Sequence, residues 1–461
     1  MFDKNVYIQR RKQLKNQVNS GVILMLGNIE SPMNYPANTY PFRQDSNFLY
    51  FFGLDKPAFA GIIDIDEDKD YIFGDDFSID DIIWMGPQPL VKDLAAGAGV
   101  SNTGTPAQLA EKVNDALSKG RKVHYLPPYR AENILKLEKL LGTSTDNVKA
   151  GFSVELIKAV VTQREIKSDD EVKEIEKALA VSYDMYAMAM KMAKPGIYER
   201  EIVGKIEGIV GSSGGLISFP IILSINGETL HNHYHGNKME KNKLLVIDSG
   251  SESPEHYASD ITRTLPVGGV FTPEQEDIYQ VVLEANTTSI EAMRPGIYNK
   301  EIHLNAARVI AQGLKDIGLM KGDIEAAVKE GAHALFFPHG LGHQLGLDVH
   351  DMEDLGENYV GYDDTIERSK QFGLAYLRMA KELKPGLVLT VEPGCYFIPA
   401  LIDIWRAENK FSTFINYDKV EKYKGFGGIR IEDDVLVTES GHRVLGKPIP
   451  KSVADIREFM K

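Results

Sequence analysis

Carboxylates that could hold a metal ion lie at the ends of apolar runs in the C-terminal two-thirds of the chain. Asp248 ends the apolar run 243–248, and Asp260 follows twelve residues later. Two carboxylates that meet at the ends of buried strands repel each other and lose their hydration. A shared cation relieves both costs, so this pair is a candidate metal site. For Asp248 alone, a simple turn residue is an equally good interpretation.

Two more acidic residues occupy similar positions further along the chain. Glu392 ends the apolar run 387–391 and precedes a Pro-Gly pair, and Glu432 lies in the segment 427–434. Strand alternation in that segment places Arg430 on the same face as Glu432. Arg430 is then either an ion-pair partner of that carboxylate, a support for the site, or a clamp for a substrate carboxylate.

Six of the eleven histidines fall in two short stretches, which are His231, His233 and His235, and His339, His343 and His350. A single histidine is more often structural than ligating. Clusters beside carboxylates, with a glycine-rich backbone at 339–343 that a ligand can approach closely, favour a metal site. Oxygen ligands with one imidazole suit Mn, Fe, Co or Zn.

Strands must bring these side chains together. Residues 243–248 and 260–264 predict two antiparallel strands joined by the polar stretch 249–256. Three segments also recur in the same order in two halves of this region, namely 193–202 as 293–302, 218–220 as 336–338, and 245–250 as 389–394. Two related α+β halves, with acidic strand ends at a central cleft, explain that order, although any one echo could be a common turn.

Residues 1–155 predict a separate α/β domain, and residues 165–461 predict a second domain, which contains the two α+β halves. Apolar runs predict strands at 22–26, 48–52, 60–63 and 123–126. The spacing of residues 106–117 predicts an amphipathic helix. Ser168 and Glu171 form a capping-box signature, which predicts a long helix at the start of the second domain.

Composition excludes several classes of protein. A chain of 461 residues is long enough for two domains or three, and its 43% hydrophobic and 26% charged residues are typical of a soluble globular protein. The net charge of −14 disfavours nucleic acid. A single cysteine, Cys395, excludes an intrachain disulfide and indicates a reducing compartment. Without a signal peptide or a membrane span in the sequence, we expect a cytoplasmic protein.

The motifs together resemble the proline-specific metallopeptidases of the creatinase-like, pita-bread fold, aminopeptidase P and prolidase. The matching segments are 247–250, 259–264, 338–343 with 350–351, 390–394 and 428–433. They span almost all of residues 165–445, and residues 40–53 resemble the N-terminal domain of aminopeptidase P. The resemblance implies an α/β plus α+β protein, with a creatinase- or ribonuclease-H-like N-terminal domain and a pseudo-twofold pita-bread domain.

The same resemblance implies a site for two divalent ions, with Mn expected and Zn, Co or Fe as alternatives. Asp248 would bind one ion, and Asp260 would bridge both. His343 and Glu392 would complete the shell of the other ion, and Glu432 would form a second bridge.

Further active-site groups follow from the resemblance. His339 and His350 match active-site histidines, while His231 and His233 compete for one more position. Glu392 is the expected proton shuttle to the leaving nitrogen. We expect His350, with His231 or His233, to stabilise the developing oxyanion.

Other segments bear on substrate choice and assembly. Residues 378–428 resemble prolidase more than aminopeptidase P, and Arg378 matches a substrate-binding arginine there. Residues 352–377 are extra relative to compact aminopeptidases P. Trp84 matches a tryptophan that reaches the pocket of a neighbouring subunit, although a core tryptophan is an equally good interpretation. The family resemblance implies a dimer or a tetramer.

The expected activity is that of an Xaa-Pro aminopeptidase acting on small peptides with proline in the second position, with no nucleic-acid or membrane partner. An Xaa-Pro dipeptidase is the alternative within the class. An inactive creatinase-like binding protein is disfavoured by the complete ligand set. A methionine aminopeptidase is disfavoured by the long N-terminal domain and the insert.

Overall fold

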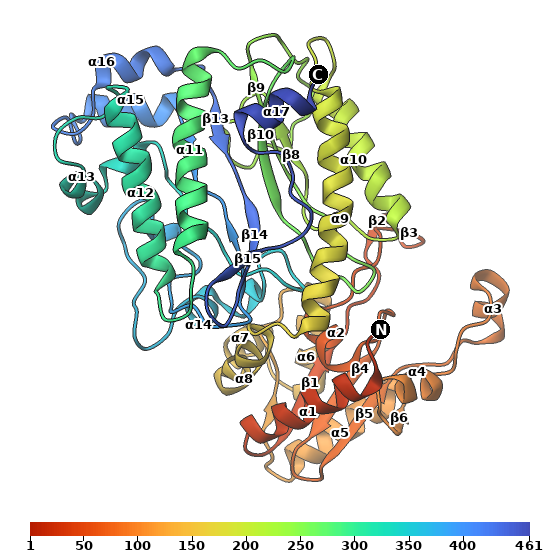
Figure 1. Cartoon of the computed structure of the whole chain (residues 1–461). Helices are drawn as coiled ribbons and strands as arrows, with labels where there is room; N and C mark the ends of the chain where they lie inside the picture. The colour runs from red at the N-terminus through yellow and green to blue at the C-terminus, as the bar shows by residue number, and fades with distance from the viewer. The chain divides into compact units, whose positions relative to one another are not determined.

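The computed structural model describes residues 1–461, which divide into two compact units. The N-terminal unit comprises residues 1–164 together with 354–359, and the C-terminal unit comprises residues 165–353 and 360–461. Figure 1 shows the elements of each. No helix has both the length and the apolar character needed to cross a membrane.

A five-stranded mixed sheet forms the centre of the N-terminal unit, in the order β6-β5-β4-β1-β7. Its strands are β1 (Val22–Leu26), β4 (Ala60–Asp64), β5 (Lys69–Phe73), β6 (Asn102–Gly104) and β7 (Val123–His124). A separate hairpin consists of β2 (Pro32–Tyr35) and β3 (Asn38–Thr39). The helices are α1 (Lys4–Gln17), α2 (Ser46–Phe52), α3 (Ile79–Met85), α4 (Val91–Gly97), α5 (Pro106–Ser118), α6 (Ala131–Leu141), α7 (Thr145–Ala150) and α8 (Val154–Arg164).

Most of the elements predicted for this unit are confirmed. The runs 22–26 and 60–63 form the central antiparallel pair β1–β4, and the predicted helix at 106–117 is α5. The run 123–126 forms a strand over its first two residues only. One face of the sheet packs on α5 and α6, whose buried side chains include Leu109, Val113 and Leu137.

The strand predicted at residues 48–52 is wrong, because these residues belong to helix α2. The side chain of Asp45 accepts a hydrogen bond from the amide of Phe48 and caps the helix, and Gly53 ends it with φ of 65°. Every residue of α2 is buried. A helix that is buried on all sides shows no amphipathic period, so a short apolar run does not distinguish it from a buried strand.

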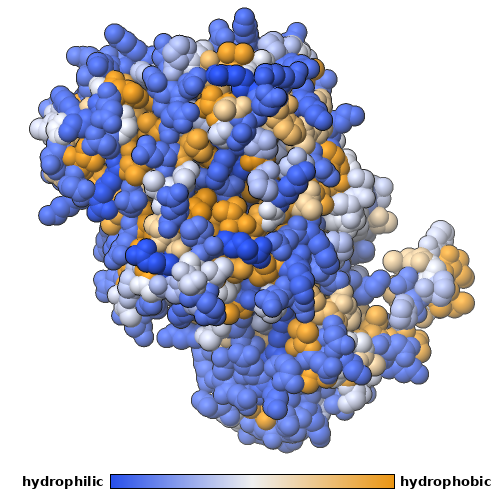
Figure 2. Space-filling view, viewed as in Figure 1, coloured by the Kyte–Doolittle hydropathy of each residue, from blue (hydrophilic) through white to orange (hydrophobic).

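Helix α3 differs from its neighbours because none of its residues is buried. Three of its apolar side chains, Ile79, Ile83 and Trp84, are 70%, 68% and 86% exposed. Figure 2 shows hydrophobic atoms gathered over this helix at the right of the view. The interpretation of Trp84 as a core residue is therefore wrong.

The C-terminal unit is built around two pairs of long helices. They are α9 (Asp169–Met192) with α10 (Glu199–Ser213), and α11 (Pro273–Ala292) with α12 (Asn299–Asp316). Figure 1 shows strands between the two pairs. As the sequence predicted, Ser168 begins α9 with a capping box that Glu171 completes.

The strands of this unit form small antiparallel sheets, ordered β10-β9-β8, β11-β14-β15 and β12-β13. Their bounds are β8 (Ile222–Ser224), β9 (Leu244–Ser249), β10 (Ile261–Pro266), β11 (Val388–Val391), β12 (Gly394–Tyr396), β13 (Gly428–Arg430), β14 (Asp433–Val437) and β15 (His442–Val444). The shorter helices of this unit are α13 (Ile324–Glu330), η1 (Ala332–Leu335), η3 (Leu374–Tyr376), α15 (Pro399–Ala407), α16 (Tyr417–Val420), η4 (Glu421–Tyr423) and α17 (Val453–Phe459). Two more short helices, η2 (Glu353–Leu355) and α14 (Glu357–Val360), lie largely in the stretch 354–359 that belongs to the N-terminal unit.

The internal repeat corresponds to repeated structure. Residues 193–202 lead from α9 into α10, and residues 293–302 lead from α11 into α12. The two connections turn at Gly196 and Gly296, whose φ values are 93° and 87°. A positive φ suits glycine because other residues clash there. Each half then supplies acidic strand ends, as the predicted pair of α+β halves requires.

Candidate metal centre and active site

A cavity of about 610 Å³ in the C-terminal unit brings together the site residues predicted from this part of the chain. Those in its wall are His231, His233, Asp248, Asp260, His339, His343, His350, Arg378, Glu392, Arg430 and Glu432. Apolar side chains complete the wall, among them Phe219, Phe372 and Tyr376. These residues span more than two hundred positions of the chain, from Phe219 to Glu432, so the fold assembles the site.

Asp248 and Asp260 meet because β9 and β10 pair antiparallel, as predicted. Asp248 lies within β9 opposite Thr262 of β10, and Asp260 directly precedes β10. Both aspartates are buried. Oxygen Oδ1 of each one is buried without a hydrogen-bond partner. Such buried acceptors are costly unless a cation satisfies them.

The imidazole of His343 directs an unprotonated nitrogen, Nε2, toward the carboxylates. Its Nδ1 lies 3.0 Å from the carbonyl oxygen of Gln344, so Nδ1 carries the hydrogen and Nε2 keeps its lone pair. Nε2 lies 3.4 Å from Asp260 Oδ2 and 3.7 Å from Glu392 Oε1. Three acceptors that face one another in this way repel unless a cation or a proton lies between them.

The backbone around His343 is held against β11. The amide of Thr390 donates to the carbonyl oxygen of His343, and the amide of His343 donates to Thr390 Oγ1. A Cβ at Gly342 would lie 2.0 Å from the carbonyl oxygen of Thr390. Glycine is therefore required at this position for His343 to reach the carboxylates.

The pKa values of the cluster also indicate that its negative charges are unfavourable without a cation. Burial raises the pKa of Asp260 and of Glu432 well above their ordinary values, and neighbouring carboxylates raise both further. Burial also raises the pKa of Glu392 to about 8, and it lowers the pKa of His343. Ligand atoms of Asp260, His343 and Glu432 lie within 4.8 Å of one another. Oxygens plus one imidazole nitrogen fit a divalent cation.

Arg430 pairs with Asp248 rather than with Glu432. Its Nη2 donates to Asp248 Oδ2 at 2.5 Å, its Nη1 donates to the hydroxyl of Tyr396 at 2.8 Å, and its Nε donates to Thr262 Oγ1 at 3.1 Å. These contacts are compatible with a supporting role for Arg430, because the guanidinium holds the carboxylate of Asp248 in place.

Sequence reasoning missed two residues whose hydroxyls hold other side chains of the site. Thr262 Oγ1 donates to Glu432 Oε2 at 2.8 Å, and the hydroxyl of Tyr396 lies 2.9 Å from Nε2 of His339. The strand period of two places Thr262 on the same face as Asp260, so alternation could have identified it. Tyr396 had no comparable signal in the sequence.

The histidines around the cluster differ in their surroundings. The ring of His350 lies 4.3 Å from that of His343, centroid to centroid. Burial lowers the pKa of His339 to about 3. The pKa of His231 is lowered by burial first and then by the charge of Arg430. Nδ1 of His233 lies 3.4 Å from the carbonyl oxygen of Ile221.

Two protein-family models match this chain. Residues 173–439 match the model described as metallopeptidase family M24, and residues 7–125 match the model described as the aminopeptidase P N-terminal domain. The chain belongs to metallopeptidase family M24. The predicted fold, an N-terminal α/β domain followed by a pita-bread domain, and the predicted metallopeptidase activity are thereby confirmed.

Relatives within family M24 carry two related names. The human Xaa-Pro dipeptidase is 32% identical over 96% of this chain and 89% of its own length. A probable Xaa-Pro aminopeptidase of Aspergillus clavatus is 33% identical over 91% of this chain and 88% of its own.

Solved structures of aminopeptidase P share the complete architecture of this M24 chain. A variant of the Escherichia coli enzyme superposes with a TM-score of 0.82 at 28% identity, covering 100% of this chain and 98% of that one. Proline aminopeptidase P II from Yersinia pestis gives a TM-score of 0.82 at 27% identity, covering 100% and 99%.

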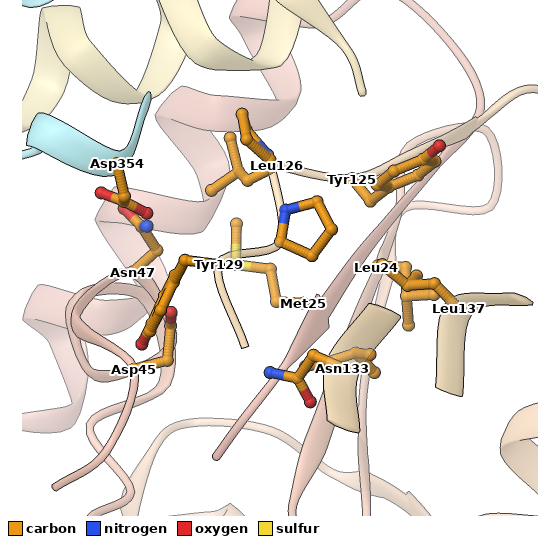
Figure 3. A pocket seen from close by; sticks show the side chains of 13 residues that line it. Leu24, Met25, Asp45, Asn47, Tyr125, Leu126, Tyr129, Asn133, Leu137 and Asp354 are labelled. Carbon is orange, nitrogen blue, oxygen red and sulfur yellow. The ribbon is translucent and has the colours of Figure 1, made fainter. Parts of the chain in front are cut away.

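A smaller hollow in the N-terminal unit has a different character (Figure 3). Its wall is formed largely by tyrosine, proline and leucine side chains, with Asp45, Asn47 and Asn133 among its polar groups. Asp45 already caps α2, and Asn47 accepts a hydrogen bond from Arg164. This wall contains no histidine, unlike the wall of the larger cavity.

Proposed function

We propose that the chain is an Xaa-Pro aminopeptidase that uses two divalent ions, with Mn as the expected metal. Asp248, Asp260, His343, Glu392 and Glu432 would hold the ions. The observation that carries this proposal is the convergence of unpartnered aspartate oxygens with the bare Nε2 of His343. When bound, the ions supply a Lewis acid and a water acidified toward neutrality.

The surrounding side chains have separate tasks in this proposal. Glu392 moves a proton to the nitrogen that leaves, because it lies at the cluster and faces the cavity. His350 and His231 donate hydrogen bonds to the substrate carbonyl oxygen. We favour His231 over His233 because Arg430 and Asp248, both at the centre, are among the charges that act on its ring.

Selection of proline follows from shape. A proline amide has no N–H to recognise, and its ring fixes φ. The cavity wall offers Phe219, Phe372 and Tyr376 as apolar surface against which a pyrrolidine ring can pack. These side chains lie in the same cavity as the metal ligands, so the proline ring and the scissile carbonyl can be held together.

A dipeptidase is the second candidate, and Arg378 favours it. This arginine lies in the wall of the catalytic cavity and could bind the free carboxylate of a dipeptide. The assay that separates the two functions gives the Mn-loaded enzyme Ala-Pro and Ala-Pro-Ala side by side. An aminopeptidase cleaves the tripeptide, whereas cleavage of the dipeptide alone would contradict the first proposal.

We also propose that the enzyme is a homo-oligomer, a dimer or a tetramer. The apolar side chains of α3 are exposed on the N-terminal unit, and burying them would be favourable. Trp84 would then reach the pocket of the neighbouring subunit. Sedimentation at assay concentration tests this, and a monomer would contradict it.

A further inference from the structure

One acidic side chain contacts two groups of the catalytic cavity at once. Glu353 Oε2 lies 2.5 Å from Nδ1 of His350, and Glu353 Oε1 lies 3.4 Å from Nη2 of Arg378. A carboxylate oxygen only accepts, so Nδ1 of His350 donates. Nε2 is then the ring nitrogen left for the substrate.

Glu353 contacts these two side chains but does not itself line the cavity. It is the first residue of η2, its side chain is 41% exposed, and it is not part of the cavity wall. Any effect of Glu353 on the substrate therefore acts through His350 and Arg378, or through its charge. The residue is a positioning residue rather than a catalytic one.

We propose that Glu353 sets the preference of the enzyme between dipeptides and longer or blocked peptides. One carboxylate oxygen holds the His350 ring, and the other partly neutralises Arg378. The guanidinium then attracts the free carboxylate of a dipeptide less strongly than an unpaired arginine would, because Glu353 repels that carboxylate. A substrate whose proline carbonyl is an amide carries no charge there and is unaffected.

This inference rests on the proposed function, since it requires the C-terminal side of the proline to approach Arg378. The contact of Glu353 with Arg378 and its contact with His350 have different expected effects, which can be measured separately. Loss of the charge alone changes the discrimination between a free acid and an amide. Loss of the hydrogen bond to His350 changes turnover of both substrates.

The test compares Ala-Pro with Ala-Pro-amide on the Mn-loaded enzyme. Glu353→Gln removes the charge but keeps an oxygen that can accept from His350. We expect this variant to raise the ratio of kcat/KM for Ala-Pro over that for Ala-Pro-amide roughly 3- to 10-fold, through KM of the dipeptide. We expect kcat for the amide to stay within about twofold of the wild type, because the hydrogen bond to His350 is kept.

Two further variants keep the test decisive. Glu353→Asp retains the charge on a shorter side chain, so we expect an almost unchanged ratio with a lower kcat for both substrates. Glu367→Gln makes the same charge change at an exposed residue in the same stretch, and we expect it to leave the ratio unchanged.

The outcomes distinguish this inference from the proposed function. An active wild type whose ratio is the same in Glu353→Gln, or is shifted equally in Glu367→Gln, would overturn the role of Glu353 alone. A wild type that cleaves neither substrate nor Ala-Pro-Ala would refute the proposed function, and this inference with it.

Discussion

At the scale of single residues, the proposed metal site depends on the groups that orient its ligands as much as on the ligands themselves. Asp248 is held by Arg430, and Glu432 is held by Thr262. Thr262 also accepts from Arg430, so one hydroxyl links both carboxylates. The five ligand positions could be proposed from sequence because each ends an apolar run or lies in a recognisable motif.

Thr262→Val tests this link. Valine has nearly the same shape but can neither donate to Glu432 nor accept from Arg430. Loss of a residue that hydrogen-bonds a metal ligand typically lowers metal affinity about tenfold to a hundredfold. We expect the affinity of the Thr262→Val variant for Mn to fall by a factor of that size. Competition with a chelator measures it.

The matched control is Thr264→Val on the same strand. Thr264 is equally buried, but its hydroxyl bonds only to the backbone of Arg430. Equal losses of metal affinity in both variants would show that the effect is a general loss of packing or hydrogen bonding in β10, not the orientation of Glu432.

The buried carboxyls predict how the metal-free protein responds to pH. The pKa of Glu392 is raised to about 8, and the pKa values of Asp260 and Glu432 are also raised. A carboxyl with a raised folded pKa stabilises the fold fully below its unfolded pKa near 4, and that stability is lost as pH rises through the folded pKa. We expect the free energy of unfolding to fall by about 1 kcal/mol or more between pH 7 and pH 8.

This pH window separates the carboxyls from the buried histidines. Burial lowers the pKa of His303 to about 3 and that of His333 to about 4, which destabilises the fold only below about pH 6.5, where unfolded histidine takes up a proton. Chemical denaturation of chelator-treated protein at pH 7 and pH 8 measures the effect, and added Mn should flatten it. A metal-free protein of constant stability across this interval would contradict the account of the cluster.

At the scale of elements, strand ends and a glycine loop decide whether the ligands meet. The pairing of β9 with β10 was predictable because an apolar run and an alternating run flank a short polar turn. The helix at 46–52 was not, because its complete burial removes the periodic signal. Tyr396 was also missed, because its contact with Arg430 depends on strands that the sequence does not order.

Gly342→Ala tests the loop that carries His343. The added Cβ would meet the carbonyl oxygen of Thr390 at 2.0 Å, so the loop must move away from β11. We expect most of the bound metal and at least about 90% of the activity to be lost, since a 1 Å displacement of a catalytic group can cost about a hundredfold. Elemental analysis after gel filtration measures the metal.

Gly211→Ala provides the control for that substitution. Gly211 lies in α10, and a Cβ there would meet nothing within 4 Å. Alanine favours a helix interior over glycine by roughly 0.5–1 kcal/mol, so this variant should be slightly more stable and fully active. Full metal content in Gly342→Ala would contradict the proposed need for glycine.

At the scale of the whole molecule, an internal repeat and an added N-terminal unit explain most of the chain. The duplicated helix pairs place acidic strand ends from both halves in one cavity, as the order of the echoed segments indicated. Sequence alone could not choose between dipeptidase and aminopeptidase. In our proposal that choice depends on how close Arg378 lies to Glu353, and no motif encodes this distance.

The central claim is that proline-specific hydrolysis depends on divalent ions held by this cluster. The most direct measurement removes metal with a chelator, restores Mn in steps, and follows release of alanine from Ala-Pro-Ala and from Ala-Ala-Ala. We expect no release without metal, recovery that rises with bound Mn toward two ions per chain, and cleavage of the proline peptide only. Full activity without metal, or equal cleavage of Ala-Ala-Ala, would contradict the claim.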